Sequence, residues 1–325
     1  MSRFHDPTKS PDRADCSPAR PLSLLLAALG GLLLPLVAPA TTVLFVGNSF
    51  FYGEGSIVKS YLPATVADLN GTGMSGVPAL FKRFTQAAGL DFQVSMEAVP
   101  GVGLDHHFNE KRLLLDRSWD EIVLSGYSTL DRDHPGDSSM LADYAGRLAK
   151  LFHCRNPGVV VHLNATWSRA DQTYLANGHW YGRPVSEMAL DVRAGNNVAL
   201  HASPYLHDVI PVGEAWNRAF ASGVADANPY DGIASGQLNL WAQDQYHAST
   251  EGYYLEALVI FGLITNQDPL TLGPGEKAAA DLGLSSAVAV ALQRVAHDEI
   301  KAQAPPAPAT KNALRVGGEC QPVAR

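Results

Sequence analysis

Short apolar runs alternate along the chain with longer stretches in which apolar side chains recur at helical spacing. This alternation is the signature of a parallel β-sheet that is covered by helices on both faces. The apolar runs predict five strands, at residues 43–46, 92–96, 121–124, 159–163 and 208–212. The pattern therefore indicates an α/β protein.

The stretches between these runs predict helices and two long loops. Between the first two strands, apolar residues recur from Val77 to Ala88, with Pro78 near the predicted helix start and Gly89 at its end. Further helices are predicted at residues 105–116, 138–152, 187–200, 213–221, 250–264 and 285–302. Residues 50–76 and 168–184 lack such a pattern and follow strand ends, where open parallel sheets bind their ligands. We expect these two loops to wall or cover a site.

Residues 1–40 predict a signal peptide, because a polar stretch ending in Arg20 precedes an apolar run at 21–37 and the small residues Ala38 and Ala40. We expect cleavage after Ala40, a mature domain at 41–302, and a disordered tail rich in Pro and Ala at 303–325. The protein is then secreted or periplasmic, with no stable membrane insertion. The alternative is an uncleaved membrane anchor, because the apolar run approaches the roughly 20 residues that span a bilayer.

Composition narrows the choice of partners and compartment. The 325 residues carry a formal net charge of -8, with 46% hydrophobic and 17% charged side chains, as expected for a globular protein. A mildly acidic chain without a cluster of Lys and Arg argues against nucleic acid as a partner. Cys154 and Cys320 lie outside the predicted signal peptide. In an oxidising compartment they can pair, or Cys154 is buried and Cys320 is free.

Three polar residues have the chemistry of a catalytic triad. Ser49 directly follows the first predicted strand, and Asp244 precedes His247 by three residues late in the chain. A serine hydroxyl is a weak nucleophile at neutral pH, so it needs a base to accept its proton and a third group to orient that base. These residues supply all three roles.

Metal and nucleotide sites are not indicated by any specific motif. The eleven histidines lack the H-E-x-x-H spacing, and no C-x-x-C pair occurs. Gly101 and Gly103 alone do not make a dinucleotide fingerprint, which needs a third glycine. We therefore expect neither a metal nor a cofactor.

Together these motifs resemble those of the SGNH (GDSL-like) hydrolases over about residues 42–266. The segment Gly47-Asn48-Ser49-Phe50 is similar to the family's nucleophile block, most of all to poorly characterised bacterial members that begin with Gly-Asn-Ser-Phe. The segment that starts Asp244-Gln245-Tyr246-His247 is similar to its acid and base block. Residues 100–104 are similar to the glycine block.

The resemblance implies a three-layer α/β/α sandwich with a roughly five-stranded parallel sheet, flavodoxin-like. It implies that Ser49 is the nucleophile, His247 the base and Asp244 the orienting acid. Backbone N–H groups of Ser49 and Gly101 would stabilise the oxyanion. The family adds an Asn side chain from a third block, but this chain has Ser125-Gly126-Tyr127 there. Tyr127 and Asn164 both remain candidates for that donor, and an amide matches the family's chemistry better.

The aromatic residues Trp167, Trp180 and Tyr181 suggest an O-acylated carbohydrate as substrate, since aromatic faces pack well on sugar rings. The alternative is that they anchor a long loop. The predicted function is an exported serine esterase that acts on a small-molecule or carbohydrate ester. The competing prediction is a catalytically inactive binding protein with the SGNH fold, at the cell surface or in the periplasm. The oligomeric state is not predicted.

Overall fold

The computed structural model describes residues 40–303 and Cys320, and in this part of the chain six strands form one parallel sheet. The strands are β1 (Thr41–Gly47), β2 (Ala67–Asp68), β3 (Phe92–Ala98), β4 (Glu121–Leu124), β5 (Val160–Asn164) and β6 (Asp208–Ile210). Their order across the sheet is β2-β3-β1-β4-β5-β6. Without the two-residue β2, this is the strand order of a flavodoxin-like sheet.

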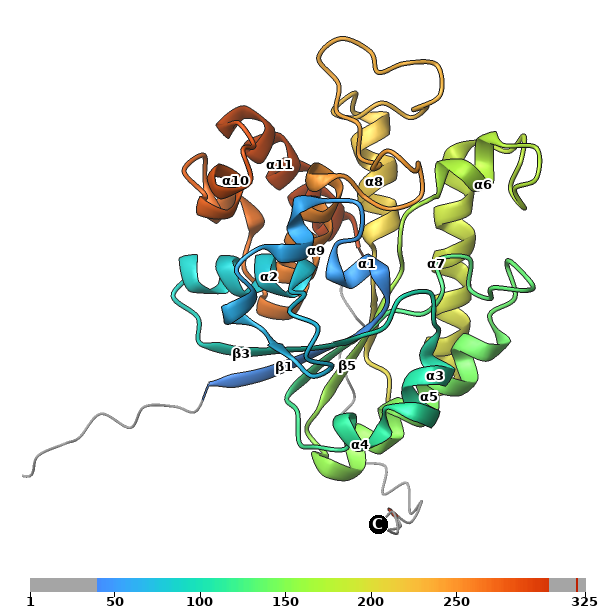
Figure 1. Ribbon diagram of the computed structural model, residues 1–325, viewed down its shortest axis with the longest axis vertical. Helices are drawn as coiled ribbons and strands as arrows, with labels where there is room; N and C mark the ends of the chain where they lie inside the picture. Colours follow the sequence, from blue (N-terminus) through green and yellow to red (C-terminus); the bar gives the residue numbers. More distant parts are fainter. Residues whose placement is uncertain (1–39, 304–319, 321–325) are drawn as a thin grey trace, which may run out of the picture. The chain divides into compact units, whose positions relative to one another are not determined.

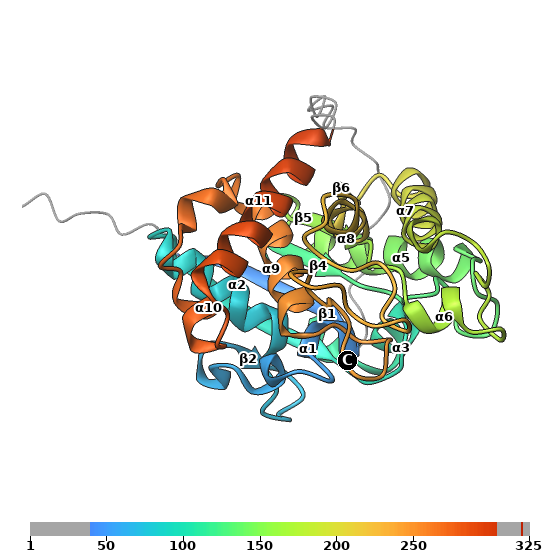
Figure 2. The same ribbon diagram turned by 90° about the horizontal axis from the view of Figure 1, so that it is seen from above.

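Helices cover both faces of the sheet, which confirms the predicted α/β/α fold class (Figures 1 and 2). One face packs on helices α2 (Gly76–Ala87), α8 (Val212–Ala221), α9 (Thr250–Thr265), α10 (Lys277–Asp281) and α11 (Ser286–Ala302). The other packs on α3 (Leu104–Glu110), α4 (Arg112–Leu115), α5 (Ser139–Arg155) and α7 (Val185–Ala202).

Strand β1 shows how the sequence divides between the two layers. Val43 and Phe45 belong to the core beneath α2 and α9, whereas Leu44 and Val46 belong to the core beneath α5 and α7. Neighbouring residues of a strand point to opposite faces, so a strand covered on both sides reads as one continuous apolar run.

The structure corrects several predicted boundaries. The two-residue strand β2 is too short for the apolar pattern to show. The helix predicted at 105–116 breaks at Lys111, which separates α3 from α4. Strand β6 ends at Ile210 rather than at 212, because Pro211 has no N–H to donate to a neighbouring strand and α8 begins after it.

The two predicted loops also contain short helices. They are α1 (Ser49–Tyr52), η1 (Ile57–Ser60) and η2 (Pro63–Thr65) in the first loop and α6 (Ala170–Tyr174) in the second, while η3 (Pro269–Leu272) lies between α9 and α10. Within residues 40–303, no helix combines the length and apolar composition needed to cross a bilayer. The predicted signal peptide, apart from Ala40, and nearly all of the predicted tail lie outside the described residues.

Cys154, near the end of α5, forms a disulfide with Cys320, and the two Cα atoms lie 5.5 Å apart. The pairing that the sequence left open is therefore present in the structure. The cross-link joins residues 166 positions apart in the chain.

Candidate active site

The candidate nucleophile lies on a tight turn from strand to helix. Strand β1 ends at Gly47, Asn48 caps the short helix α1, and Ser49 is the first helical residue. The Asn48 side chain accepts a hydrogen bond from the N–H of Phe50, as expected of an N-cap residue. The first N–H groups of a helix have no partner within it, so the Ser49 N–H can bind an oxyanion.

Asp244, His247 and Ser49 form one chain of hydrogen bonds. The His247 Nδ1 lies 2.6 Å from Asp244 Oδ2, and its Nε2 lies 2.9 Å from Ser49 Oγ. The second carboxylate oxygen of Asp244 accepts from the N–H groups of Tyr246 and His247, at 3.0 and 2.9 Å. This arrangement fixes the ring so that Nε2 faces the serine, as general-base chemistry requires.

The carboxyl group of Asp244 is held in its charged form. Burial acts in the opposite direction, but hydrogen bonds from the His247 ring and from two backbone N–H groups lower the pKa of Asp244 below its ordinary value. An ionised acid at this place stabilises the imidazolium that forms when His247 takes the serine proton.

The turn that joins acid to base is itself constrained. Gln245 has φ 55°, the left-handed region that residues other than glycine rarely adopt. Its N–H donates to the Ala242 carbonyl at 3.0 Å, and the Ala242 N–H donates to the His247 carbonyl at 2.8 Å. These bonds hold the strained residue in place and bring Asp244 back toward the His247 ring.

Two further loops reach the same sheet edge. Gly101 follows β3 and Tyr127 follows β4, on either side of β1, where the strand order reverses and ligands bind in this fold. Gly101 has φ 66°, a conformation that favours glycine. Asn48 links the three loops, because its side-chain amide donates to the carbonyls of Val102 and Gly126, both at 3.0 Å.

Of the two candidates for the additional oxyanion donor, only Tyr127 lies among these loops. Its ring packs so closely on Gly103, at the start of α3, that a Cβ added there would come within 2.5 Å of a ring carbon. Burial first, and then the charge of Asp105, raises the pKa of Tyr127, so the hydroxyl keeps its proton.

Asn164 is placed differently from what the sequence led us to expect. Its side-chain amide donates to Glu256 of α9 at 2.7 Å, and both residues are buried between sheet and helix. Because that amide is committed to a carboxyl group in the core, the expected oxyanion role of Asn164 does not fit the structure. Burial raises the pKa of Glu256 to about 8, although the bond from Asn164 acts against it.

The aromatic residues predicted to bind substrate are also placed differently. Trp167 is fully buried and stacks between Phe50 and Trp216, at centroid distances of 4.4 and 4.6 Å. Trp180 is equally buried, and its indole N–H donates to Asp191 of α7 at 2.8 Å. Neither ring can meet a sugar without unpacking the core. The Tyr181 side chain is exposed and is absent from the cavity beside the triad described below.

Three residues that the sequence did not single out complete the surroundings of the triad. Tyr246 stacks on the His247 ring with centroids 4.1 Å apart, and the guanidinium carbon of Arg169 lies 3.5 Å from the Tyr246 ring centre. The Tyr253 hydroxyl donates to the Ser49 and Glu54 carbonyls, at 3.4 and 2.9 Å. Tyr246 lies inside the motif of Asp244 and His247, which is the one signal that pointed to it.

A cavity of about 250 Å³ lies next to this constellation. Tyr246, which stacks on the base, and Gly101, which follows β3, belong to its wall. The full lining is Gly101, Tyr127, Ser128, Thr129, Arg132, Pro135, Arg169, Gln172 and Tyr246. Most of these side chains carry hydroxyl, amide or guanidinium groups, so the cavity suits a polar ligand.

Groups that could ligate a metal lie elsewhere. In the described part of the chain, one cluster of three such side chains occurs: His162 on β5, Asp208 at the start of β6, and His207, which directly precedes β6. The start of β6 lies away from the carboxyl edge of the sheet, which carries Ser49.

No protein-family model matches the chain, and no curated protein matches it. Among solved structures, a DUF4886 family protein from Bacteroides uniformis is 17% identical, with a TM-score of 0.53, covering 82% of this chain and 98% of that one. An SGNH-hydrolase candidate from Slackia heliotrinireducens is 20% identical (TM-score 0.44; 70% and 100% covered). A GDSL-like lipase candidate from Parabacteroides merdae is 13% identical (TM-score 0.46; 70% and 96% covered). The first likeness shows that this chain shares the fold of the Bacteroides protein.

Proposed function

We propose that the protein is an exported serine esterase that hydrolyses carboxylic esters through an acyl-enzyme on Ser49. The observation that carries this proposal is the hydrogen-bonded chain from Asp244 through His247 to Ser49 at the carboxyl edge of a parallel sheet. Three groups in that order are what a serine needs to become a nucleophile.

The proposed reaction has two halves. The Ser49 Oγ forms a bond to the ester carbonyl carbon while His247 Nε2 accepts the hydroxyl proton, and the alcohol then leaves with that proton. Water next attacks the acyl-enzyme, with His247 again as base, and the carboxylic acid leaves as Ser49 regains its proton. The N–H groups of Ser49 and Gly101 and the Tyr127 hydroxyl are the proposed oxyanion donors.

We further propose that the alcohol part of the ester is a carbohydrate. The support comes from the polar cavity beside the triad, where Ser128, Thr129 and Gln172 offer hydrogen bonds and Arg132 is an exposed cation. A cavity lined in this way matches a polyhydroxy group better than a long alkyl chain. Trp167 and Trp180 are buried and give no reason to expect a sugar, whereas these cavity residues do.

Export is supported by the disulfide between Cys154 and Cys320, because stable disulfides form in oxidising compartments and are rare in the cytosol. The apolar run that precedes Ala38 and Ala40 points the same way.

A fluorophosphonate probe tests the central claim. We expect covalent labelling of the wild-type protein at Ser49, no labelling of a folded Ser49→Ala variant, and loss of ester hydrolysis in that variant. Absence of labelling in folded wild-type protein would support the competing function, a binding protein that keeps the fold. That alternative is motivated by the missing Asn of the third block.

The substrate claim has its own test. An O-acetylated oligosaccharide should be hydrolysed with a higher kcat/KM than p-nitrophenyl acetate. Gln172→Ala should raise KM for the oligosaccharide and leave the constants for the aryl ester unchanged, since Gln172 lines the cavity without touching the triad or Tyr127. Equal effects on both esters would contradict a sugar site in the cavity.

A further inference from the structure

A second cluster of chemically active side chains lies at the opposite edge of the sheet from Ser49. Glu121 and Asp208 are the first residues of β4 and β6, and His162 lies on β5 between them. Because the strands are parallel, their amino ends share one edge, whereas Ser49 follows the carboxyl end of β1. The esterase chemistry proposed above makes no use of this cluster.

The backbone fixes the positions of these residues. His162 and Asp208 are directly opposite each other in the pairing of β5 with β6, and the His207 N–H donates to the Val161 carbonyl at 2.8 Å. Hydrogen-bonded backbone of the sheet, rather than a loop, therefore positions the side chains that could ligate a metal.

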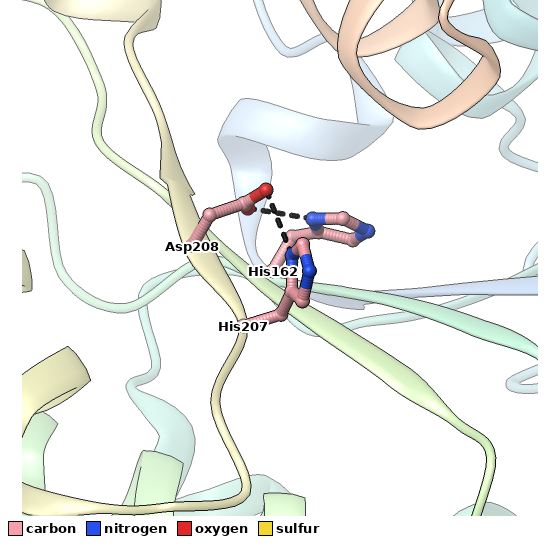
Figure 3. A group of neighbouring side chains, drawn as sticks. All are labelled: His162, His207 and Asp208. Carbon is pink, nitrogen blue, oxygen red and sulfur yellow. Dashed lines mark hydrogen bonds and ion pairs between the residues drawn. The ribbon is translucent and has the colours of Figure 1, made fainter. Parts of the chain in front are cut away.

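The donor atoms converge on the Asp208 carboxylate. Its two oxygens lie 2.6 Å from His162 Nδ1 and 3.0 Å from His207 Nδ1, and the three donor atoms lie within 4.8 Å of one another. Figure 3 shows both imidazole rings turned toward that carboxylate. Ligands of a tetrahedral zinc ion are about 3.3 Å apart, given Zn–N bonds of about 2.0 Å, so the two contacts to Asp208 would lengthen by less than about 1 Å and the widest separation would shorten by at most about 1.5 Å.

Glu121 adds the support that a metal-binding histidine usually has. Its carboxylate lies 3.0 Å from His162 Nε2, the ring nitrogen that faces away from Asp208. A metal would replace the contact between Nδ1 and Asp208, and a carboxylate on the second nitrogen orients the ring for this and makes it a stronger ligand. His162 is almost fully buried, so its orientation is fixed as well.

The cluster also lacks a permanent cation. Among residues 40–303, neither Glu121 nor Asp208 forms an ion pair with a lysine or arginine, and their ion-pair partners are the two histidines. No lysine or arginine of the described residues therefore competes with a divalent ion for these two carboxylates.

We propose that His162, His207 and Asp208 bind one Zn²⁺, with Glu121 as the positioning residue behind His162. Two imidazole nitrogens and one carboxylate oxygen are ligands that zinc accepts, and water takes the remaining position on the exposed side of His207. The ion would tie the three-residue edge strand β6 to the sheet.

The test uses the mature, tag-free protein titrated with ZnCl₂ by calorimetry, with metal content measured after dialysis. We expect about one Zn²⁺ per chain, tetrahedral bands with Co²⁺, and a rise in Tm of about 5 °C at zinc concentrations about 100 times Kd. His207→Ala, at a half-exposed position that can lose its side chain without unfolding, should weaken binding at least about tenfold, and Glu121→Gln similarly.

His201→Ala is the matched control, because His201 is an exposed histidine at the end of α7 outside the cluster. It should bind zinc like the wild type. The proposal is wrong if wild-type protein binds no stoichiometric zinc, or if His207→Ala binds as tightly as His201→Ala. In that event the cluster is an imidazolium of His162 held between two carboxylates. None of these measurements depends on the proposed esterase activity.

Discussion

The Tyr246 ring lies against the His247 imidazole, with centroids 4.1 Å apart and planes inclined by 28°. The Arg169 guanidinium is 3.5 Å from the same Tyr246 ring centre. One ring face has room for one planar group at such distances, so arginine and histidine lie on opposite faces of the tyrosine. The base is thereby held by Asp244 at its edge and by Tyr246 on its face.

Removing this support should affect turnover more than binding. We expect Tyr246→Ala to lower kcat about 10- to 100-fold, because a small displacement of a base from its reacting atom is costly. Tyr246→Phe keeps the ring and should retain most of the activity. Steady-state kinetics on one aryl ester checks both variants, and a near-normal kcat for Tyr246→Ala would show that Asp244 alone positions the ring.

Tyr127→Phe should reduce kcat by about 100- to 1,000-fold with little change in KM, the usual result of losing an oxyanion donor.

Asn164→Ala should leave kcat within a few fold but lower stability by about 1 to 3 kcal/mol, since Glu256 loses its hydrogen-bond partner in the core. Kinetics and chemical denaturation of both variants make the comparison. A kcat loss confined to Asn164→Ala would reverse the assignment, and normal kcat in both would leave the backbone N–H groups as sole donors.

The buried Glu256 should make stability fall with rising pH. Its pKa is raised to about 8 by burial, so the folded state holds a proton that the unfolded chain releases above about pH 4.3. The stability that this proton contributes is fully present below the pKa of an unfolded glutamate, about 4.3, and is lost as the pH rises toward the folded pKa of about 8. Glu256→Gln removes this titrating group. The free energy of unfolding of the variant relative to the wild type should therefore rise from pH 5 to pH 8, by on the order of 3 kcal/mol. Urea unfolding at both pH values measures this, and a pH-independent difference would contradict it.

Breaking the cross-link should destabilise the protein. Replacing Cys154 and Cys320 together by serine should lower the free energy of unfolding by about 2 to 5 kcal/mol, because the disulfide closes a long loop that restricts the unfolded chain. Esterase activity at low temperature should be retained. Thermal unfolding with and without a reductant provides the check, and an identical Tm for oxidised and reduced wild type would contradict the expected stabilisation.

The exported protein should begin at or near Thr41. Ala38 and Ala40 present the small residues that a signal peptidase recognises. Intact mass measurement of protein recovered from the extracellular or periplasmic fraction tests this. A full-length N-terminus in the membrane fraction would establish the anchor instead.

The parts of the site that sequence could predict are those defined by position along the chain. Ser49 follows an apolar strand and Asp244 precedes His247 by three residues, so their order and the strand ends sufficed to group them. The sequence did not show that the Asn164 amide binds Glu256, because this depends on how α9 packs against the sheet. Trp167 and Trp180 misled for the same reason, since a loop sequence does not say which of its aromatic side chains turn inward.

Gln245 gives the acid and base turn a particular character. A non-glycine residue in the left-handed region costs about 1 to 3 kcal/mol, and here it separates Asp244 from His247. A glycine there would relax the turn and also loosen the distance between carboxylate and imidazole. Hydrogen bonds to neighbouring residues hold this segment in an unfavourable backbone conformation. The protein gives up some backbone stability at Gln245, and in return the Asp244 carboxylate stays within 2.6 Å of the His247 ring.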